Sequence, residues 1–260
     1  MQTSKLTQAM LASIILGTSS LATAATWTFN NTNTNTQSGV TATATGWANT
    51  VGAANTALES AFLTYNGASG LGVKNNDCGT SPCTGSGDTN EGIAPEHAID
   101  NDQRKDSILF SFAGDKVNLN TTNFGWVSQD AGYQDADYSV YAYTGLGVGS
   151  LNGLNYTDPA LATAGWTLVG HYEGGSATGS KTITGNIFSS YWLIGATNGT
   201  NDAKKDAFKL LSVAGGTCTG TPGGRGCGGG STSVPEPGTL ILVGMGLLGL
   251  TRATRRRPAR

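Results

Sequence analysis

Short apolar runs separated by turn-forming residues follow one another along most of this chain, and they restrict it to a small group of folds. Many runs contain β-branched or aromatic residues, and several alternate in the period of two that half-buried strands show. Asn-Gly pairs that begin at Asn66, Asn152 and Asn198 provide hairpin turns. The predicted strands are Val40–Ala48, Phe62–Tyr65, Leu71–Lys74, Ser107–Phe112, Val117–Leu119, Phe124–Ser128, Tyr138–Tyr143, Trp166–Glu173, Lys181–Thr184, Ser190–Ala196 and Phe208–Val213.

This pattern, without a clear long helix, predicts an all-β fold: a two-sheet antiparallel sandwich, most simply of jelly-roll type. An open immunoglobulin-like sandwich is the alternative. The low-complexity segment Asn30–Gln37 is predicted to be a loop between edge strands. The segment Thr56–Glu59 fits a helical capping box, but it runs directly into Asn66-Gly67, which favours a strand.

The C-terminal segment Val234–Arg260 has three blocks: a Pro-Glu-Pro triplet, an apolar run over Gly238–Leu250 and a basic end. The 13 apolar positions cover about 20 Å as a helix, less than the roughly 30 Å of the hydrocarbon core. Such a segment is a poor permanent anchor, but it can insert transiently while its arginines stay at the cytoplasmic surface. The residues of this signal are Val234, Pro235, Glu236, Pro237, Arg255, Arg256 and Arg257.

In all three blocks the segment resembles the PEP-CTERM sorting signal of Gram-negative bacteria. The resemblance implies that an exosortase in the inner membrane recognises Pro235–Pro237 and removes the tail. The body is then delivered to the cell surface or to an extracellular exopolysaccharide matrix, as in a biofilm. An ordinary tail anchor is the alternative, although it needs neither paired prolines nor a short apolar run.

The N-terminal residues 1–25 carry Lys5, an apolar region and Ala22-Thr23-Ala24, which together indicate a secretory signal peptide. The chain therefore divides into a signal peptide (1–25), a β-sandwich domain (26–214), a Gly-rich linker (215–233) and the sorting signal with a short transmembrane helix (234–260). Removing Lys5, the five terminal arginines and Glu236 from the 15 basic and 17 acidic residues leaves 9 and 16. The acidic body makes nucleic acid a poor partner.

Four cysteines in an exported chain suggest disulfide bonds, because the periplasm and the exterior are oxidising. Their spacing suggests two local pairs, Cys78–Cys83 and Cys218–Cys227. Metal binding is the competing interpretation, but no histidine lies next to them and the spacing matches no common zinc site.

Two groups of aspartates precede apolar strands. Asp100 and Asp102, with Asp106, form the first group, and Asp135 and Asp137 belong to the second. A structural Ca²⁺ near Asp100 and Asp102 would offset this charge, with the other three as further candidate ligands. Arg104 and Lys105 could instead balance the first group, and solvated loop acids are the equal alternative.

Part of the body resembles a family of exosortase-dependent surface proteins. The resemblance rests on Gly70-Leu71-Gly72-Val73, Pro95–Asn101, Asp106 with Ile108–Phe112, Gly125-Trp126 and Asp135–Val140. It implies a surface protein and transfers no catalytic residue. It also draws attention to His97 and Asp100, where an imidazole that caps a turn or hydrogen-bonds Asp100 is favoured over a metal ligand.

The sequence supports a structural or adhesive surface protein linked to exopolysaccharide, and not an enzyme. Only two histidines are present, His97 and His171, and neither a Gly-x-Ser-x-Gly nor a His-Glu-x-x-His motif occurs. A calcium-dependent carbohydrate-binding module is the main alternative, and a glycan-active enzyme is a weaker one. The aromatic candidates for sugar binding are Trp126, Tyr133, Tyr141, Tyr143, Trp166, Tyr172 and Trp192.

Overall fold

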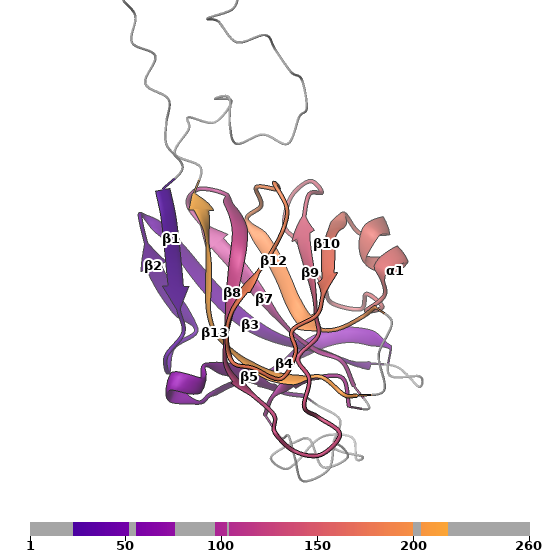
Figure 1. Cartoon of the computed structure of the whole chain (residues 1–260). Coiled ribbons are helices and arrows are strands. Elements are labelled where there is room, and N and C mark those ends of the chain that lie inside the picture. Colours follow the sequence, from indigo (N-terminus) through magenta and orange to yellow (C-terminus); the bar gives the residue numbers. More distant parts are fainter. Residues whose placement is uncertain (1–22, 52–55, 76–96, 103, 200–203, 218–260) are drawn as a thin grey trace, which may run out of the picture. The chain divides into compact units, whose positions relative to one another are not determined.

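The computed structural model describes residues 23–51, 56–75, 97–102, 104–199 and 204–217 (Figure 1). Most of them lie in strands, and the exceptions include the 3₁₀ turn η1 (Gly67–Ser69) and the helix α1 (Asp158–Thr163). The strands are β1 (Thr23–Thr28), β2 (Thr34–Gln37), β3 (Val40–Val51), β4 (Ala57–Tyr65), β5 (Leu71–Lys74), β6 (Ile99–Asp100), β7 (Asp106–Ala113), β8 (Val117–Val127), β9 (Tyr138–Tyr143), β10 (Trp166–Tyr172), β11 (Gly179–Thr182), β12 (Tyr191–Ala196) and β13 (Ala207–Thr217).

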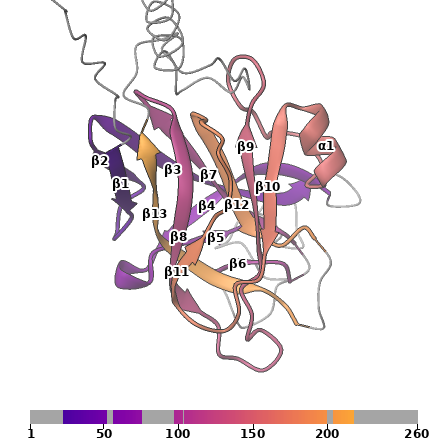
Figure 2. The same ribbon diagram turned by 45° about the horizontal axis from the view of Figure 1, so that its top comes forward.

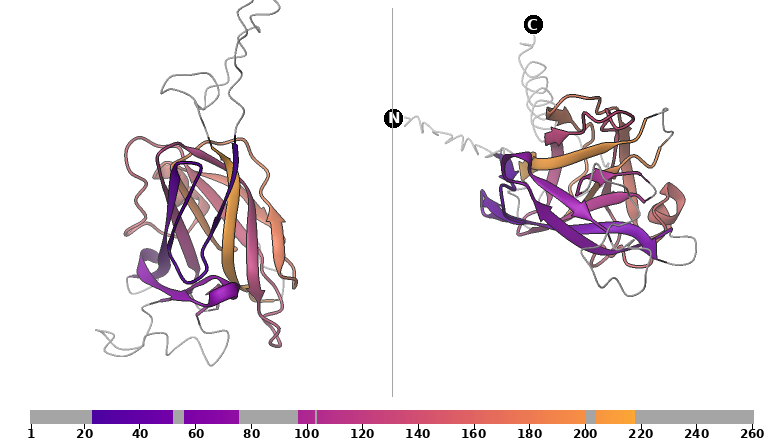
Figure 3. Two further views of the ribbon diagram at one scale, coloured as in Figure 1. Left: turned by 90° about the vertical axis from the view of Figure 1, so that its left-hand side faces the viewer. Right: turned by 90° about the horizontal axis from the view of Figure 1, so that it is seen from below.

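These strands form one hydrogen-bonded path in the order β10-β9-β12-β7-β3-β4-β5-β13-β8-β11. The short strands β1 and β6 pair with β13, and β2 pairs with β3. The first part of strand β4, residues 57–61, pairs with β3, and its last part, residues 62–65, pairs with β5, so the sheet continues through β4 and curls (Figures 2 and 3). The antiparallel all-β prediction is confirmed, whereas two separate sheets of jelly-roll type are not.

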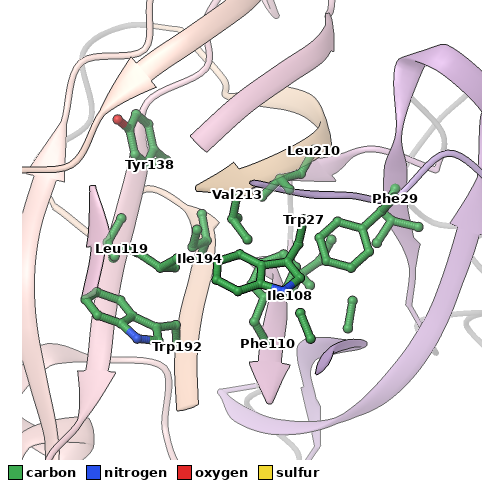
Figure 4. Close-up of a cluster of buried hydrophobic side chains, with 14 of the residues drawn as sticks. Trp27, Phe29, Ile108, Phe110, Leu119, Tyr138, Trp192, Ile194, Leu210 and Val213 are labelled. Carbon is green, nitrogen blue, oxygen red and sulfur yellow. The ribbon is translucent and has the colours of Figure 1, made fainter. Parts of the chain in front are cut away.

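The two halves of the curled sheet enclose one large apolar core (Figure 4). Trp27 of β1 meets Phe112 of β7 with ring centroids 4.9 Å apart, and Phe124 of β8 meets Tyr138 of β9 at 5.2 Å. The buried Trp27 indole donates a hydrogen bond to the Val40 carbonyl oxygen at 3.0 Å. The polar atom of this large ring is therefore satisfied inside the core.

A second, smaller core lies on the other face of β9, β10 and β12. It contains Leu161 of α1, packed with Tyr141, Trp166 and Leu193. The α1 helix has Pro159 in its first turn, where a missing backbone N–H costs nothing. The sequence prediction missed this helix, because its six residues are too few to show a helical period.

The observed strands match several predictions and correct others. Leu71–Lys74 and Tyr138–Tyr143 are strands with the predicted bounds, and the strand favoured at Thr56–Glu59 is the start of β4. The loop prediction for Asn30–Gln37 is wrong in its second half, which forms β2 against β3. The two strands predicted within Val117–Ser128 are one strand, β8, because it pairs with nearly the whole of the long β13.

Two predicted boundaries fall inside strands. Strand β13 continues through Gly215 to Thr217, so the predicted linker at 215–233 begins inside a strand. Strand β1 begins at Thr23, before the predicted end of the signal peptide at residue 25. The four cysteines, the remainder of the signal peptide and the segment 234–260 lie outside the described residues.

Candidate functional site

Three aspartates meet where β9 and β13 begin, and their backbone pairing places them there. Asp135 and Asp206 form a parallel bridge, in which the Ala207 amide donates to the Asp135 carbonyl oxygen at 2.9 Å. Asp137 lies two residues further along, and one carboxylate oxygen from each of the three lies within 4.8 Å of the others. We call Asp135, Asp137 and Asp206 the carboxylate cluster.

The carboxylate cluster is buried, and its carboxylates accept hydrogen bonds from backbone amides. Asp135, Asp137 and Asp206 are only 5%, 6% and 2% exposed. The Asp137 amide donates to Asp206 Oδ1 at 2.8 Å, and the Gly174 amide donates to Asp137 Oδ1 at 2.9 Å. A Cβ at Gly174 would lie 1.8 Å from the Ala136 carbonyl oxygen, so this approach requires glycine.

Burial, together with the neighbouring carboxylates of Asp137 and Asp135, raises the pKa of Asp206 to about 8. The hydrogen bond from the Asp137 amide acts in the opposite direction. A cation among the three carboxylates would offset the unfavourable charge. Oxygens within 4.8 Å of one another fit Ca²⁺, which holds its ligands at about 2.3–2.6 Å.

The calcium site expected at Asp100 and Asp102 lies beside the carboxylate cluster, and its charge is handled differently. The Asp102 carboxylate accepts hydrogen bonds from the Tyr133 hydroxyl and from the Lys205 ammonium group. The Asp102 amide in turn donates to Asp100 Oδ1 at 3.0 Å. A lysine distant in sequence therefore balances Asp102, which makes a cation less necessary at this position than at the carboxylate cluster.

The other residues of the sequence prediction do not gather at one place. Asp135 and Asp137 enter the carboxylate cluster, whereas Asp106 lies in β7 with the Asn75 amide 3.4 Å from its Oδ1. Lys105, expected to balance Asp100 and Asp102, donates to Asn198 Oδ1 at 2.9 Å. Asn101 connects the two groups, since the Asp206 amide donates to its Oδ1 at 3.0 Å.

Sequence reasoning missed Asp206, although a signal was present. Asp206 stands immediately before the apolar start of β13, as Asp137 stands immediately before β9. The position of an acid at a strand start is therefore repeated, but only the three-dimensional pairing shows which strand starts meet. We call the end of the sheet that carries Asp102, Asp135, Asp137 and Asp206 the acidic end.

A second polar group contains a serine, a histidine and an aspartate. Ser139 Oγ lies 2.8 Å from His171 Nδ1, and His171 Nε2 lies 3.1 Å from Asp158 Oδ2. Ser139 is fully buried in β9, between β10 and β12, and its Oγ also accepts a hydrogen bond from the Asn198 amide at 2.7 Å. A buried hydroxyl that already has these partners is poorly placed to attack a substrate.

The comparisons with known proteins bear on the C-terminal segment. A family described as the PEP-CTERM protein-sorting motif matches residues 233–257. The chain carries a PEP-CTERM sorting motif. This motif indicates export, processing by an exosortase and placement at the cell surface. A search of curated proteins and a search of solved structures each returned no match.

The assignment to exosortase-dependent sorting rests on the PEP-CTERM motif at residues 233–257. None of the helices in the described ranges has the length and apolar character needed to cross a membrane.

Proposed function

We propose that the body of this protein is a structural or adhesive component of the cell surface, associated with exopolysaccharide, in a Gram-negative bacterium. The observation that carries the proposal is the PEP-CTERM motif at residues 233–257, which makes the chain an exosortase substrate. The cleavage chemistry at Pro235–Pro237 belongs to the exosortase. The function of this chain then depends on the surface that its β-structure presents after delivery.

The aromatic side chains favour this passive role over sugar binding. Tyr141, Trp166 and Trp192 are buried in the two cores. The other four are half-buried and packed or hydrogen-bonded; for example, the ammonium group of Lys209 lies 5.0 Å from the Trp126 ring centroid. Sugar-binding platforms need open ring faces, so these rings contribute to folding more than to recognition.

Calcium-dependent carbohydrate binding is the second candidate, and the carboxylate cluster is the observation that favours it. The residues of this cluster are at most 6% exposed. A cation held there would be coordinated by protein oxygens and not by a ligand from solution. This suits a structural ion better than one that coordinates a sugar hydroxyl.

An enzymatic role would have to use the group of Ser139, His171 and Asp158. Here Ser139 meets Nδ1 and Asp158 meets Nε2, and the hydroxyl has no exposed surface. We therefore assign this group to the stability of β9 and β10. The proposal includes no catalytic residue.

The sorting step is tested by changing Glu236 to Ala in the producing cell. The variant is expected to accumulate as the full-length precursor in the inner membrane, whereas the parent chain is shortened and reaches the surface. A Ser231→Ala variant, outside the Pro-Glu-Pro triplet, is the matched control and should be processed normally. Normal release and surface display of Glu236→Ala would contradict the assignment.

The surface role is tested by glycan-array binding of the released protein, with and without calcium. A matrix or coat protein should show no specific hit in either condition. A specific, calcium-dependent hit would overturn the passive role and establish the carbohydrate-binding alternative.

A further inference from the structure

The loop that follows β9 exposes two aliphatic side chains at its tip. Leu146 is 98% exposed and Val148 is 72% exposed, more than any other large hydrophobic residue in the described ranges. They alternate with glycines in the sequence Gly145-Leu146-Gly147-Val148-Gly149. Single exposed aliphatic residues are common, but two that project together from one loop form an unusual apolar point.

Hydrogen bonds hold this loop in place, so the exposure of Leu146 and Val148 follows from its structure. The Tyr143 hydroxyl donates a hydrogen bond to the Leu146 carbonyl oxygen at 2.8 Å, and the amides of Thr144 and Gly145 both donate to the Gly165 carbonyl oxygen. A Cβ at Gly145 would lie 2.8 Å from the Tyr143 ring. The chain is thus wrapped over this ring, and Leu146 and Val148 are held outward.

An aromatic group supports the loop from below. The Tyr143 ring centroid lies 5.3 Å from that of Trp166 and 6.1 Å from that of Tyr191. Tyr143 and Tyr191 are both half-buried. Tyrosine is the side chain that, with tryptophan, favours the boundary between lipid head groups and acyl chains.

The loop lies at the end of the sheet from which the chain continues to the PEP-CTERM motif. Thr217, the last residue of β13, pairs with Val117, and Val117 forms a bridge with Ser189. The Ser189 hydroxyl donates to the Tyr143 carbonyl oxygen at 2.7 Å. Strands β9 and β13 therefore finish at the same end of the sheet (Figure 1), and we call this the tail end.

The two ends of the sheet differ in charge. The described connections at the tail end are 38–39, 114–116, 144–149 and 183–190, and their only charged residues are Asp115 and Lys116, which cancel. The acidic end lies where β9 and β13 begin, at the opposite ends of these strands. Carboxylates disfavour anionic lipid surfaces, so the body can approach a membrane closely with its tail end and not with its acidic end.

We propose that the loop Thr144–Gly149 is a membrane-docking tip that inserts Leu146 and Val148 into the lipid interface while the C-terminal motif holds the chain at the membrane. The partner is a lipid bilayer, contacted through apolar side chains without basic residues. Docking would fix the orientation of the body, tail end towards the lipid, before the exosortase acts. The proposal goes beyond the surface role and its failure would leave the sorting assignment intact.

The test uses the full-length chain reconstituted in phosphatidylcholine vesicles, with acyl-chain-brominated phosphatidylcholine as a quencher of tryptophan fluorescence. The reporter variant is Leu146→Trp. The matched control is Leu168→Trp, which replaces another exposed leucine (38%) on β10, away from the loop tip. Flotation first verifies that each variant is incorporated, and thermal melts verify that each is folded.

The brominated lipid should quench the added emission of Leu146→Trp and not that of Leu168→Trp, equally at low and high salt. Adding Val148→Asp to the reporter should lower the docked-to-free ratio by on the order of tenfold or more, as the loss of one buried aliphatic side chain implies. Equal quenching of the reporter and the control would overturn the proposal. A reporter that responds to protein density and not to brominated lipid would also overturn it, because the tip would then bind a second copy of the chain.

Discussion

The backbone amide of Asp137 donates a hydrogen bond to the carboxylate of Asp206 at 2.8 Å, which joins the starts of two strands that are 69 residues apart in the chain. The bond, together with the bridge between Asp135 and Asp206, joins the two halves of the curled sheet at its acidic end. The same bond brings the Asp206 carboxylate next to the carboxylates of Asp135 and Asp137. A contact that joins the two halves of the fold therefore also brings three carboxyl groups together.

The raised pKa of Asp206 predicts that stability falls with rising pH when no divalent cation is present. The folded chain holds the Asp206 proton up to about pH 8, whereas the unfolded chain releases it near the ordinary value of 3.8. Between these values the folded state binds more protons, so the free energy of unfolding decreases as the pH rises. Urea denaturation in EDTA at a series of pH values measures this slope.

The variant Asp206→Asn should flatten that slope, because its side chain does not titrate. The readout is the slope and not the absolute stability. The new amide group also changes the contact with Asn101, which alters the stability at every pH. Asp130→Asn, on the surface of the loop between β8 and β9, is the matched control and should retain the parent slope. An unchanged slope in Asp206→Asn would show that other groups cause the pH dependence.

The calcium expectation predicts a higher melting temperature in millimolar calcium than in EDTA. At a calcium concentration about 100 times the Kd, the gain is about 2.7 kcal/mol, or roughly 5–10 °C for a domain of this size. The double variant Asp135→Asn/Asp137→Asn should lose this gain, and Asp115→Asn at the tail end should keep it. Identical melting temperatures of the parent chain in EDTA and in calcium would contradict a structural calcium ion.

Much of the fold could be predicted from sequence because the burial of a strand is visible in the pattern of its own residues. In β9 and β12, adjacent apolar and aromatic residues identified the strands nearly to the residue. Strand β2 could not be recognised, because its residues Thr34–Gln37 are polar and it is a strand only through its pairing with β3. The path through β4 could not be recognised either, since no local pattern says that one strand changes its pairing partner along its length.

The candidate site was predictable only in part for a related reason. Asp135 and Asp137 attracted notice because they are close in sequence, and so did Asp100 and Asp102. Asp206 and Lys205 are distant in sequence from both groups, and the register of β13 decides that one joins the carboxylate cluster while the other neutralises Asp102. Composition revealed excess acid, whereas only the fold showed where each charge is balanced.

The glycine at position 72 is predicted to be essential for stability. A Cβ there would lie 1.7 Å from the His97 carbonyl oxygen, and this backbone atom cannot move aside as a side chain could. Gly72→Ala should therefore cost at least about 3 kcal/mol. Gly185→Ala, whose Cβ would meet only the Val169 side chain at 3.0 Å, is the control and should cost much less. Urea denaturation compares the two, and equal midpoints would mean that the His97 segment shifts readily.

The hydroxyl of Ser139 is predicted to stabilise the fold without taking part in a reaction. Ser139→Ala removes the acceptor of the Asn198 amide and the partner of His171 Nδ1, and should lower the free energy of unfolding by about 1–3 kcal/mol. Ser180→Ala, at the exposed edge strand β11, provides the control and should change it by less than about 0.5 kcal/mol. The decisive comparison adds an ester-hydrolysis assay of the purified protein. A Ser139→Ala variant with unchanged stability and an abolished hydrolytic activity would show that the group of Ser139, His171 and Asp158 is catalytic after all.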